Sequence, residues 1–269
     1  MEHPIWVTVI VNRLLGKPAL ALLAALHIQP SNPEYPIPNH VSMEILVFLL
    51  AVVFFLWLRA RISGDRPGAA QQCMEMLLTN PMDVGLHDLL KESVGHGWEK
   101  YVAMLGSIGI WVLFCNLISL VPSLESPTAQ VSVPLGCAIV VFLYYNWTGI
   151  AKFNPLGHAK HFLGPVLPMA PLMLPIELIS HSARLLSLTV RLWVNMLVSE
   201  LLYGIFLGLL LELYLYLAKV NTALHALFIL PLLLPIVFIL LHIFVAVLQA
   251  FVFTILPVIY VSGAVAEEH

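Results

Sequence analysis

Charged side chains are scarce in this chain. Only 10% of the 269 residues are Asp, Glu, Lys or Arg, whereas soluble domains carry about 25%. The net charge of −3 gives no indication of nucleic-acid binding. With 60% hydrophobic residues and a mean hydropathy of +0.94, the composition is that of an integral membrane protein.

The motifs of soluble enzymes are also missing. The sequence has no H-E-x-x-H pair, no P-loop and no G-x-G-x-x-G turn, and its three cysteines form no C-x-x-C pair. His158 and His161 lie among lysines, which argues against a metal site. Ser180 and Ser182 are merely adjacent to His181 in sequence and form no catalytic triad. We therefore expect no metal, no cofactor and no catalytic residue.

Long apolar runs predict helices. The strands of a membrane barrel alternate over segments of about 10 residues, whereas these runs are near-continuous and about 18 residues or longer. They cover residues 41–58, 101–121, 131–151, 168–217 and 222–261. We predict an all-α integral membrane protein with three upright transmembrane helices, a surface amphipathic helical segment and a hairpin of two long inclined intramembrane helices.

The last two runs are too long to stand upright in a bilayer. As helices, 168–217 and 222–261 would measure about 75 Å and about 60 Å, against a hydrocarbon core of about 30 Å. Prolines crowd the entrance of the first run and interrupt the second. Two inclined helices packed as a hairpin satisfy both observations best.

The order of the runs also predicts regions and orientation. The regions are an N-terminal interfacial or extracytoplasmic segment (1–40), a transmembrane scaffold (41–167) with a cytoplasmic amphipathic segment (68–98), and the helical hairpin (168–269). Arg59, Arg61 and Arg66 follow the first run, so the positive-inside rule places that end in the cytoplasm. The N-terminus is then outside and the C-terminus cytoplasmic. Glu2 and His3 replace the basic start of a signal peptide, which favours a retained interfacial helix.

Polar residues gather between Glu177 and Glu200, inside the fourth apolar run. Ionisable side chains at bilayer depth cost about 2.5 to 3.5 kcal/mol each on insertion scales, and they normally face a protein interior or a water-filled path. At about 100° per residue, one stripe of the helix carries Glu177, Ser187, Arg191 and Asn195. Glu200 lies about 13 Å beyond Arg191 and on the opposite face.

The last apolar run offers possible partners, His242 and Gln249, which lie within about 20° of each other on the helical wheel. An arginine cannot lose its proton in a protein, so Arg191 would be a fixed positive barrier. Buried Glu and His side chains can exchange protons near neutral pH, as a relay needs. The set therefore favours ion translocation over the alternative of polar groups that only bridge helices.

At these residues the chain resembles subunit a of the membrane (Fo) sector of F-type ATP synthases. The family signature S-L-x-x-R-L-x-x-N-M-x-x-x-E appears from Ser187 to Glu200, and the partner motif H-x-x-x-x-x-x-Q-A-F/Y-x-F begins at His242. The segments PGAAQQCMEMLL and CNLISLVP and the Ala-Glu-Glu-His ending are similar to family segments as well. The resemblance covers about residues 41–269 and is most specific through 175–260.

The resemblance implies a proton-translocating stator subunit of a rotary ATP synthase, which is not an enzyme by itself. It would provide two offset half-channels to the c-ring, and Arg191 would be the essential arginine between them. The other site residues would line the outer half-channel (Glu200, His242, Asn195, Gln249) or the cytoplasmic half-channel (Glu177, Ser187, His181). The implied partners are the c-ring proteolipid oligomer, the b-type subunits of the peripheral stalk and the remainder of the synthase, in the lipid bilayer of a bacterial plasma (inner) membrane.

Some positions depart from the family pattern. Leu185 replaces a frequent Pro, Val194 a Gly or Ala, and Ser199 a common Gly. Ser119 and Gln130 replace residues that are often acidic near the outer loop. The resemblance therefore does not imply an acidic lining of the entry vestibule in this chain.

Two other function classes are alternatives. A stand-alone proton-coupled transporter or ion channel would use the same polar residues without a rotating partner, but transporters often show inverted repeats, which are not evident here. An intramembrane hydrolase would need a nucleophile or a metal set, which the sequence does not offer.

Overall fold

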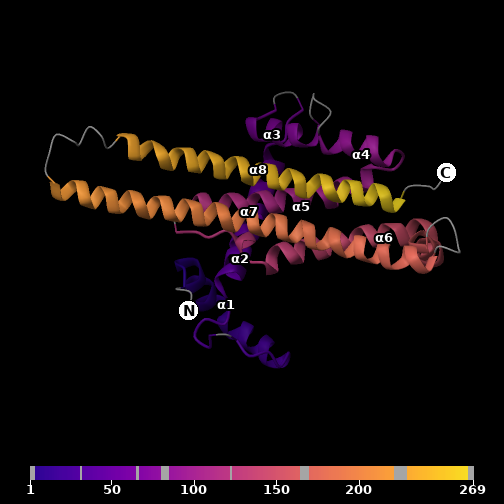
Figure 1. The fold of residues 1–269 in the computed structure, drawn as a ribbon, viewed down its shortest axis with the longest axis horizontal. Coiled ribbons are helices and arrows are strands. Elements are labelled where there is room, and N and C mark those ends of the chain that lie inside the picture. Colours follow the sequence, from indigo (N-terminus) through magenta and orange to yellow (C-terminus); the bar gives the residue numbers. More distant parts are fainter. Residues whose placement is uncertain are drawn as a thin grey trace. The chain divides into compact units, whose positions relative to one another are not determined.

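Every regular element that the computed structural model describes is a helix (Figure 1). The described residues are 4–30, 32–64, 67–79, 85–121, 123–163, 170–220 and 229–265, with side chains except at 154–163, 170, 217–220 and 229–235. The helices are α1 (Trp6–Ala25), α2 (Asn39–Arg61), α3 (Ala69–Leu78), α4 (Leu86–Val94), α5 (Glu99–Leu117), α6 (Ser132–Leu163), α7 (Ala170–Val220) and α8 (Ile229–Val265), with short 3-10 turns η1 (Ile118–Leu120) and η2 (Pro127–Ala129).

The predicted all-helical class is confirmed. Among the described residues, 6 helices are long and apolar enough to cross a membrane. One of them is α1, which has 20 residues and is longer than the short interfacial helix expected there. The helical pieces expected within 68–98 appear as α3 and α4. The upright and inclined orientations remain predictions.

The two overlong apolar runs form continuous helices. Helix α7 has 51 residues and α8 has 37, which correspond to about 76 Å and about 55 Å. Pro171 falls in the first turn of α7, where its missing N–H removes no helical hydrogen bond. Residues 221–228, between the two helices, lie outside the described residues, as do Arg66, the side chains of His158 and His161, and the tail at 266–269.

The chain divides into two compact units. Unit 1 comprises 1–54, 113–130 and 194–247, and unit 2 comprises 55–112, 131–193 and 248–269. Helices α2, α5, α7 and α8 each contribute a segment to both units. The candidate site residues are therefore described below unit by unit.

In unit 1, two asparagines join α1 to the segment that leads into α2. The side chain of Asn12 donates to the carbonyl oxygen of Ile37 and accepts from its N–H, both at 2.9 Å. Asn39, at the start of α2, accepts from the Thr8 hydroxyl at 2.8 Å, and both side chains are buried. These paired polar groups fix the segment that leads into α2 against α1.

In unit 2, α5 and α8 come into close contact at Gly109. A Cβ added there would lie 2.1 Å from the Thr254 hydroxyl oxygen, so the contact requires glycine. At the end of α8, the Lys152 ammonium donates to the carbonyl oxygen of Val265 at 2.8 Å, as cations often do at helix C-termini. The α8 segment of unit 2 is thus held by both α5 and α6.

Candidate functional site

His242 is the centre of a polar cluster in unit 1. Its side chain comes from α8 and is buried. Ser199 of α7 lies 2.6 Å from Nδ1, and Ser119 of η1 lies 3.0 Å from Nε2. The carbonyl oxygen of Asn116 is 3.3 Å from the same Nε2. Three segments of the chain therefore converge on one imidazole.

The partners of His242 determine where the neutral ring carries its hydrogen. The carbonyl oxygen of Asn116 can only accept. The Ser119 hydroxyl already donates to that oxygen at 3.1 Å, so its own oxygen is left to accept. Nε2 is therefore the donor, and Nδ1 accepts the hydrogen of the Ser199 hydroxyl. An incoming proton meets the basic nitrogen of His242 at the Ser199 side.

Glu200 is held by the loop before α6. One of its carboxylate oxygens accepts from the backbone N–H of Ser126 at 2.8 Å. The Ser126 hydroxyl in turn donates to the carbonyl oxygen of Cys115 at 2.9 Å and lies 2.6 Å from the Thr128 hydroxyl. The Thr128 hydroxyl donates to the Asn116 side chain at 2.7 Å. This network of neutral groups fixes the Glu200 carboxylate.

A small cavity joins Glu200 to His242. It has a volume of about 30 Å³ and is lined by Ser119, Leu120, Glu200, Tyr203, Ile239 and His242. A water molecule needs about 10–15 Å³ and two or more polar partners, and this cavity offers both. A single water can therefore lie beside Glu200, Ser119 and the His242 ring, whose basic nitrogen itself faces the Ser199 hydroxyl.

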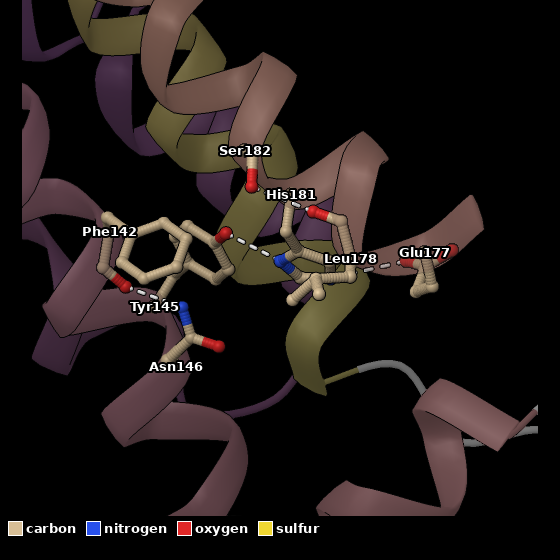
Figure 2. A network of polar contacts seen from close by, with 7 residues as sticks. All are labelled: Phe142, Tyr145, Asn146, Glu177, Leu178, His181 and Ser182. Atoms are coloured by element: carbon tan, nitrogen blue, oxygen red, sulfur yellow. Dashed lines mark hydrogen bonds and ion pairs between the residues drawn. The ribbon is translucent and has the colours of Figure 1, made fainter. Parts of the chain in front are cut away.

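In unit 2, a second polar network surrounds His181 (Figure 2). The Tyr145 hydroxyl of α6 lies 2.7 Å from His181 Nδ1. Nε2 of the same ring lies 3.2 Å from a carboxylate oxygen of Glu177, one turn earlier on α7. The Tyr145 and His181 rings stack, with centroids 5.7 Å apart and 27° between their planes. The predicted neighbours Glu177 and His181 are thus brought together, with a tyrosine added.

Arg191 lies on an uncovered face of α7. Its side chain is exposed, and its guanidinium donates a long hydrogen bond of 3.4 Å to the Ser187 hydroxyl. Neighbouring apolar residues of the same segment, Leu186 and Val190, are exposed as well. A permanent charge on an apolar, exposed helix face is suited to a partner that brings an opposite charge.

The two amide side chains of the predicted site belong to different units. Asn195 lies in unit 1 and is half-buried, whereas Gln249 lies in unit 2 and is fully buried. Their joint lining of one half-channel with Glu200 and His242 stays a prediction. In the described part of the chain, no group of three or more His, Cys, Asp or Glu residues is placed to hold a metal ion.

Several partners in these clusters were not predicted from the sequence. Ser119 and Ser199 were noticed only as departures from the family pattern, and that departure was the available signal. Tyr145 belongs to an aromatic-rich part of its helix, where nothing local distinguishes it. Ser126 contributes a backbone N–H to Glu200, which no residue type can indicate.

The comparisons with known proteins all identify the same family. Residues 41–262 match the family model described as ATP synthase A chain. The chain is 38% identical to ATP synthase subunit a of Koribacter versatilis (strain Ellin345) over 269 residues, which is 100% of both chains. It is 44% identical to ATP synthase subunit a of Solibacter usitatus (strain Ellin6076) over 87% of this chain and 90% of that one. A third relative, ATP synthase subunit a of Sulfurihydrogenibium sp. (strain YO3AOP1), is 34% identical over 86% and 99% of the two chains.

Proposed function

The chain belongs to the ATP synthase A chain family, and from this premise we propose that it is the proton-translocating stator subunit of a rotary F-type ATP synthase. In this role it is a multi-pass membrane subunit without catalytic residues of its own. The observation that carries the proposal is the cavity that joins Glu200 to His242, because it gives two proton-exchanging side chains room for a shared water.

The outer half-channel is assigned to Glu200 and His242, with Asn195 and Gln249 extending it. Support comes from the loop and helix contacts that hold Glu200 and His242 beside one cavity. Protons entering from outside pass along this pair to a carboxylate of the c-ring. A neutralised carboxylate can then move into the apolar membrane at a much lower cost than a charged one.

Arg191 is assigned the role of the barrier between the two half-channels. Because a guanidinium stays charged, protons cannot use it as a carrier, but a passing ring carboxylate is stabilised in its ionised form beside it. The proton is then released into the cytoplasmic half-channel, assigned to Glu177, Ser187 and His181. Each elementary charge that crosses is driven by about 2.3 kcal/mol per 100 mV.

The c-ring is the partner that fits the uncovered face of α7. In the most apolar window of Pro171–Tyr216 only 6% of the residues are buried within the chain, against 39% for Glu99–Leu120. A helix so little covered by its own chain must meet lipid or another subunit. We assign this face to the ring, the hairpin 168–269 to proton translocation, and the peripheral contacts to b-type stalk subunits and the rest of the synthase.

We also propose the membrane in which the chain resides and its orientation there. The chain resides in a bacterial plasma (inner) membrane, with the N-terminus outside and the C-terminus in the cytoplasm. The arginines after α2 support this orientation through the positive-inside rule.

Replacing Arg191 by Ala in the assembled synthase tests the proposal. Coupled ATP synthesis in vesicles should be abolished, because the ring carboxylate loses its counter-ion and the barrier between the water paths disappears. Arg59→Ala, at the last turn of α2, is the matched control and should leave synthesis intact. Normal synthesis by the Arg191→Ala complex would overturn the assignment.

A further inference from the structure

We propose that Tyr145, His181 and Glu177 form a proton wire that connects the cytoplasmic half-channel to water. His181 is the carrier, Glu177 the exchanging group at the water end, and Tyr145 the residue that positions the ring. This inference rests on the proposed function, and it names a pathway that the family motif does not contain, because Tyr145 lies in another helix.

The wire links Tyr145, His181 and Glu177 in this order (Figure 2). Tyr145 is 2% exposed. The side chains of His181 and Glu177 are 12% and 38% exposed. Hydrogen-bonding contacts of 2.7 Å and 3.2 Å link the three groups in that order. A chain of exchangeable groups with rising exposure is suited to carrying protons from the interior of the chain to its surface, where the proposed cytoplasmic half-channel supplies water.

The hydrogen bonds define the resting state of the wire. An ionised Glu177 can only accept, so His181 donates through Nε2–H. Nδ1 then accepts the hydrogen of the Tyr145 hydroxyl. The Glu177 carboxylate thereby selects one tautomer, and the tyrosine hydroxyl donates to the unprotonated nitrogen Nδ1.

Each transfer through the His181 ring takes up one proton and releases one proton. A protonated water on the interior side gives its excess proton to the Tyr145 oxygen and becomes neutral, while the tyrosine passes its own hydrogen to Nδ1. The resulting imidazolium gives its Nε2 proton to a Glu177 oxygen, and the carboxyl group releases it to water. The ring is then the Nδ1–H tautomer, and proton exchange with water, which takes the Nδ1 hydrogen and returns one to Nε2, restores the Nε2–H tautomer that Glu177 again selects. One proton enters, one leaves, and no other reactant is required.

The groups near His181 favour transfer of the proton to Glu177 over its retention on the imidazole. The Tyr260 ring of α8 lies 5.8 Å from that of Tyr145, and the Arg184 guanidinium lies 5.4 Å above Tyr260. Tyr145 and Glu177 contact His181 directly, and Tyr260 and Arg184 follow beyond Tyr145. The positive charge of Arg184, nearly one turn along α7, opposes a long-lived imidazolium and promotes transfer to Glu177.

The first test replaces His181 by Gln in the complete synthase in vesicles and measures passive proton flux through Fo. Glutamine keeps hydrogen bonds to both neighbours but cannot carry a proton. The flux should fall about tenfold, less than the about 100-fold or more typical of a lost proton-transfer group, because water can partly replace the ring. A purely structural histidine would be rescued by this variant. Assembly is checked by the amount of c-ring that co-purifies.

The second test replaces Tyr145 by Phe, which keeps the ring stack and removes the hydroxyl. The flux should again fall, and the ¹⁵N resonance of His181 Nδ1 should shift because its hydrogen-bond donor is gone. The matched control is Tyr144→Phe, the neighbouring tyrosine, which packs against Tyr101 and should change neither signal.

The outcomes distinguish a failure of the proton wire from a failure of the proposed function. If His181→Gln and Tyr145→Phe leave the flux unchanged while Arg191→Ala abolishes coupling, the wire is wrong and the stator assignment stands. If Arg191→Ala leaves coupling intact, the stator assignment itself fails. Equal losses in Tyr144→Phe and Tyr145→Phe would also overturn the wire.

Discussion

His242 has a carbonyl and a hydroxyl on one side of its ring and a single hydroxyl on the other. Only the Ser199 side leaves a basic nitrogen available. The hydroxyl can turn from donating to accepting, so it adapts when Nδ1 gains a proton. At the scale of single residues, Ser199 is therefore the contact through which His242 gains its proton.

Replacing Ser199 by Ala should slow proton entry. A neutral hydrogen bond contributes about 1 kcal/mol, which corresponds to about a fivefold change in rate if it acts in the transfer step. Passive proton flux through Fo should fall by that order, and Ser199→Thr should retain most of it because the hydroxyl remains.

Ser182→Ala is the matched control for Ser199→Ala. Its hydroxyl donates to the carbonyl oxygen of Leu178 on the same helix, so its loss should not affect the flux. Unchanged flux in Ser199→Ala, or an equal loss in Ser182→Ala, would contradict the role given to Ser199.

The charged residues could be predicted at this scale, but their partners could not. Arg191 and Glu200 are conspicuous because ionisable groups are rare in apolar runs. The serines around His242 are common residue types, and they lie 43 and 123 residues away from it in sequence. Only folding brings them together.

At the scale of helices, Gly109 marks a close approach of α5 to α8 within unit 2. Thr254 cannot simply rotate away from an added methyl group, because its hydroxyl donates to the carbonyl oxygen of Ala250 and its branched side chain is stiff. Small residues allow such close approach between membrane helices.

Gly109→Ala should therefore destabilise the packing of α5 against α8. Overpacking typically costs about 1–3 kcal/mol, which outweighs the gain of about 1 kcal/mol from replacing a helical glycine by alanine. The thermal unfolding temperature of the detergent-solubilised complex should decrease. Gly136→Ala in α6 is the control, since an added Cβ there meets nothing within 4 Å, and it should be neutral or stabilising. An equal effect of both substitutions would contradict the packing argument.

Helix positions could be predicted well where hydrophobicity alone defines them. The run 101–121 corresponds to α5 and η1, and the run 41–58 corresponds to α2. Helix α6 continues to Leu163, beyond the predicted apolar end at 151. Its extension carries polar residues, and a helix can continue into such a segment without a change in hydrophobic pattern.

At the scale of the whole molecule, the proposed function predicts that the chain conducts no protons by itself. The outer and inner pathways would meet only through a carboxylate that the chain does not supply. In liposomes, the purified chain should therefore conduct no protons, and flux should appear when an oligomeric, Gly-rich, two-helix proteolipid is reconstituted with it.

The same reconstitution experiment tests the alternative of a stand-alone transporter or channel. Proton flux through the chain alone would identify a stand-alone transporter or channel. Co-purification with the proteolipid would support the stator assignment, and its absence from a gently solubilised complex would count against it.

The sequence by itself determined the membrane class, the helical architecture, the family and the conspicuous ionisable residues. Each of these depends on local composition or on a short motif, so no distant contact is needed to recognise it. The unusual lengths of α7 and α8 were also encoded locally, as apolar runs of about 40 to 50 residues.

Only the tertiary structure decided how those residues are held. The Ser126 backbone reaches Glu200 across 74 residues of sequence, and the Tyr145 hydroxyl reaches His181 across 36. Such contacts depend on where helices and loops meet in space. The tautomers of both histidines follow from them, because a carbonyl or a carboxylate can only accept a hydrogen.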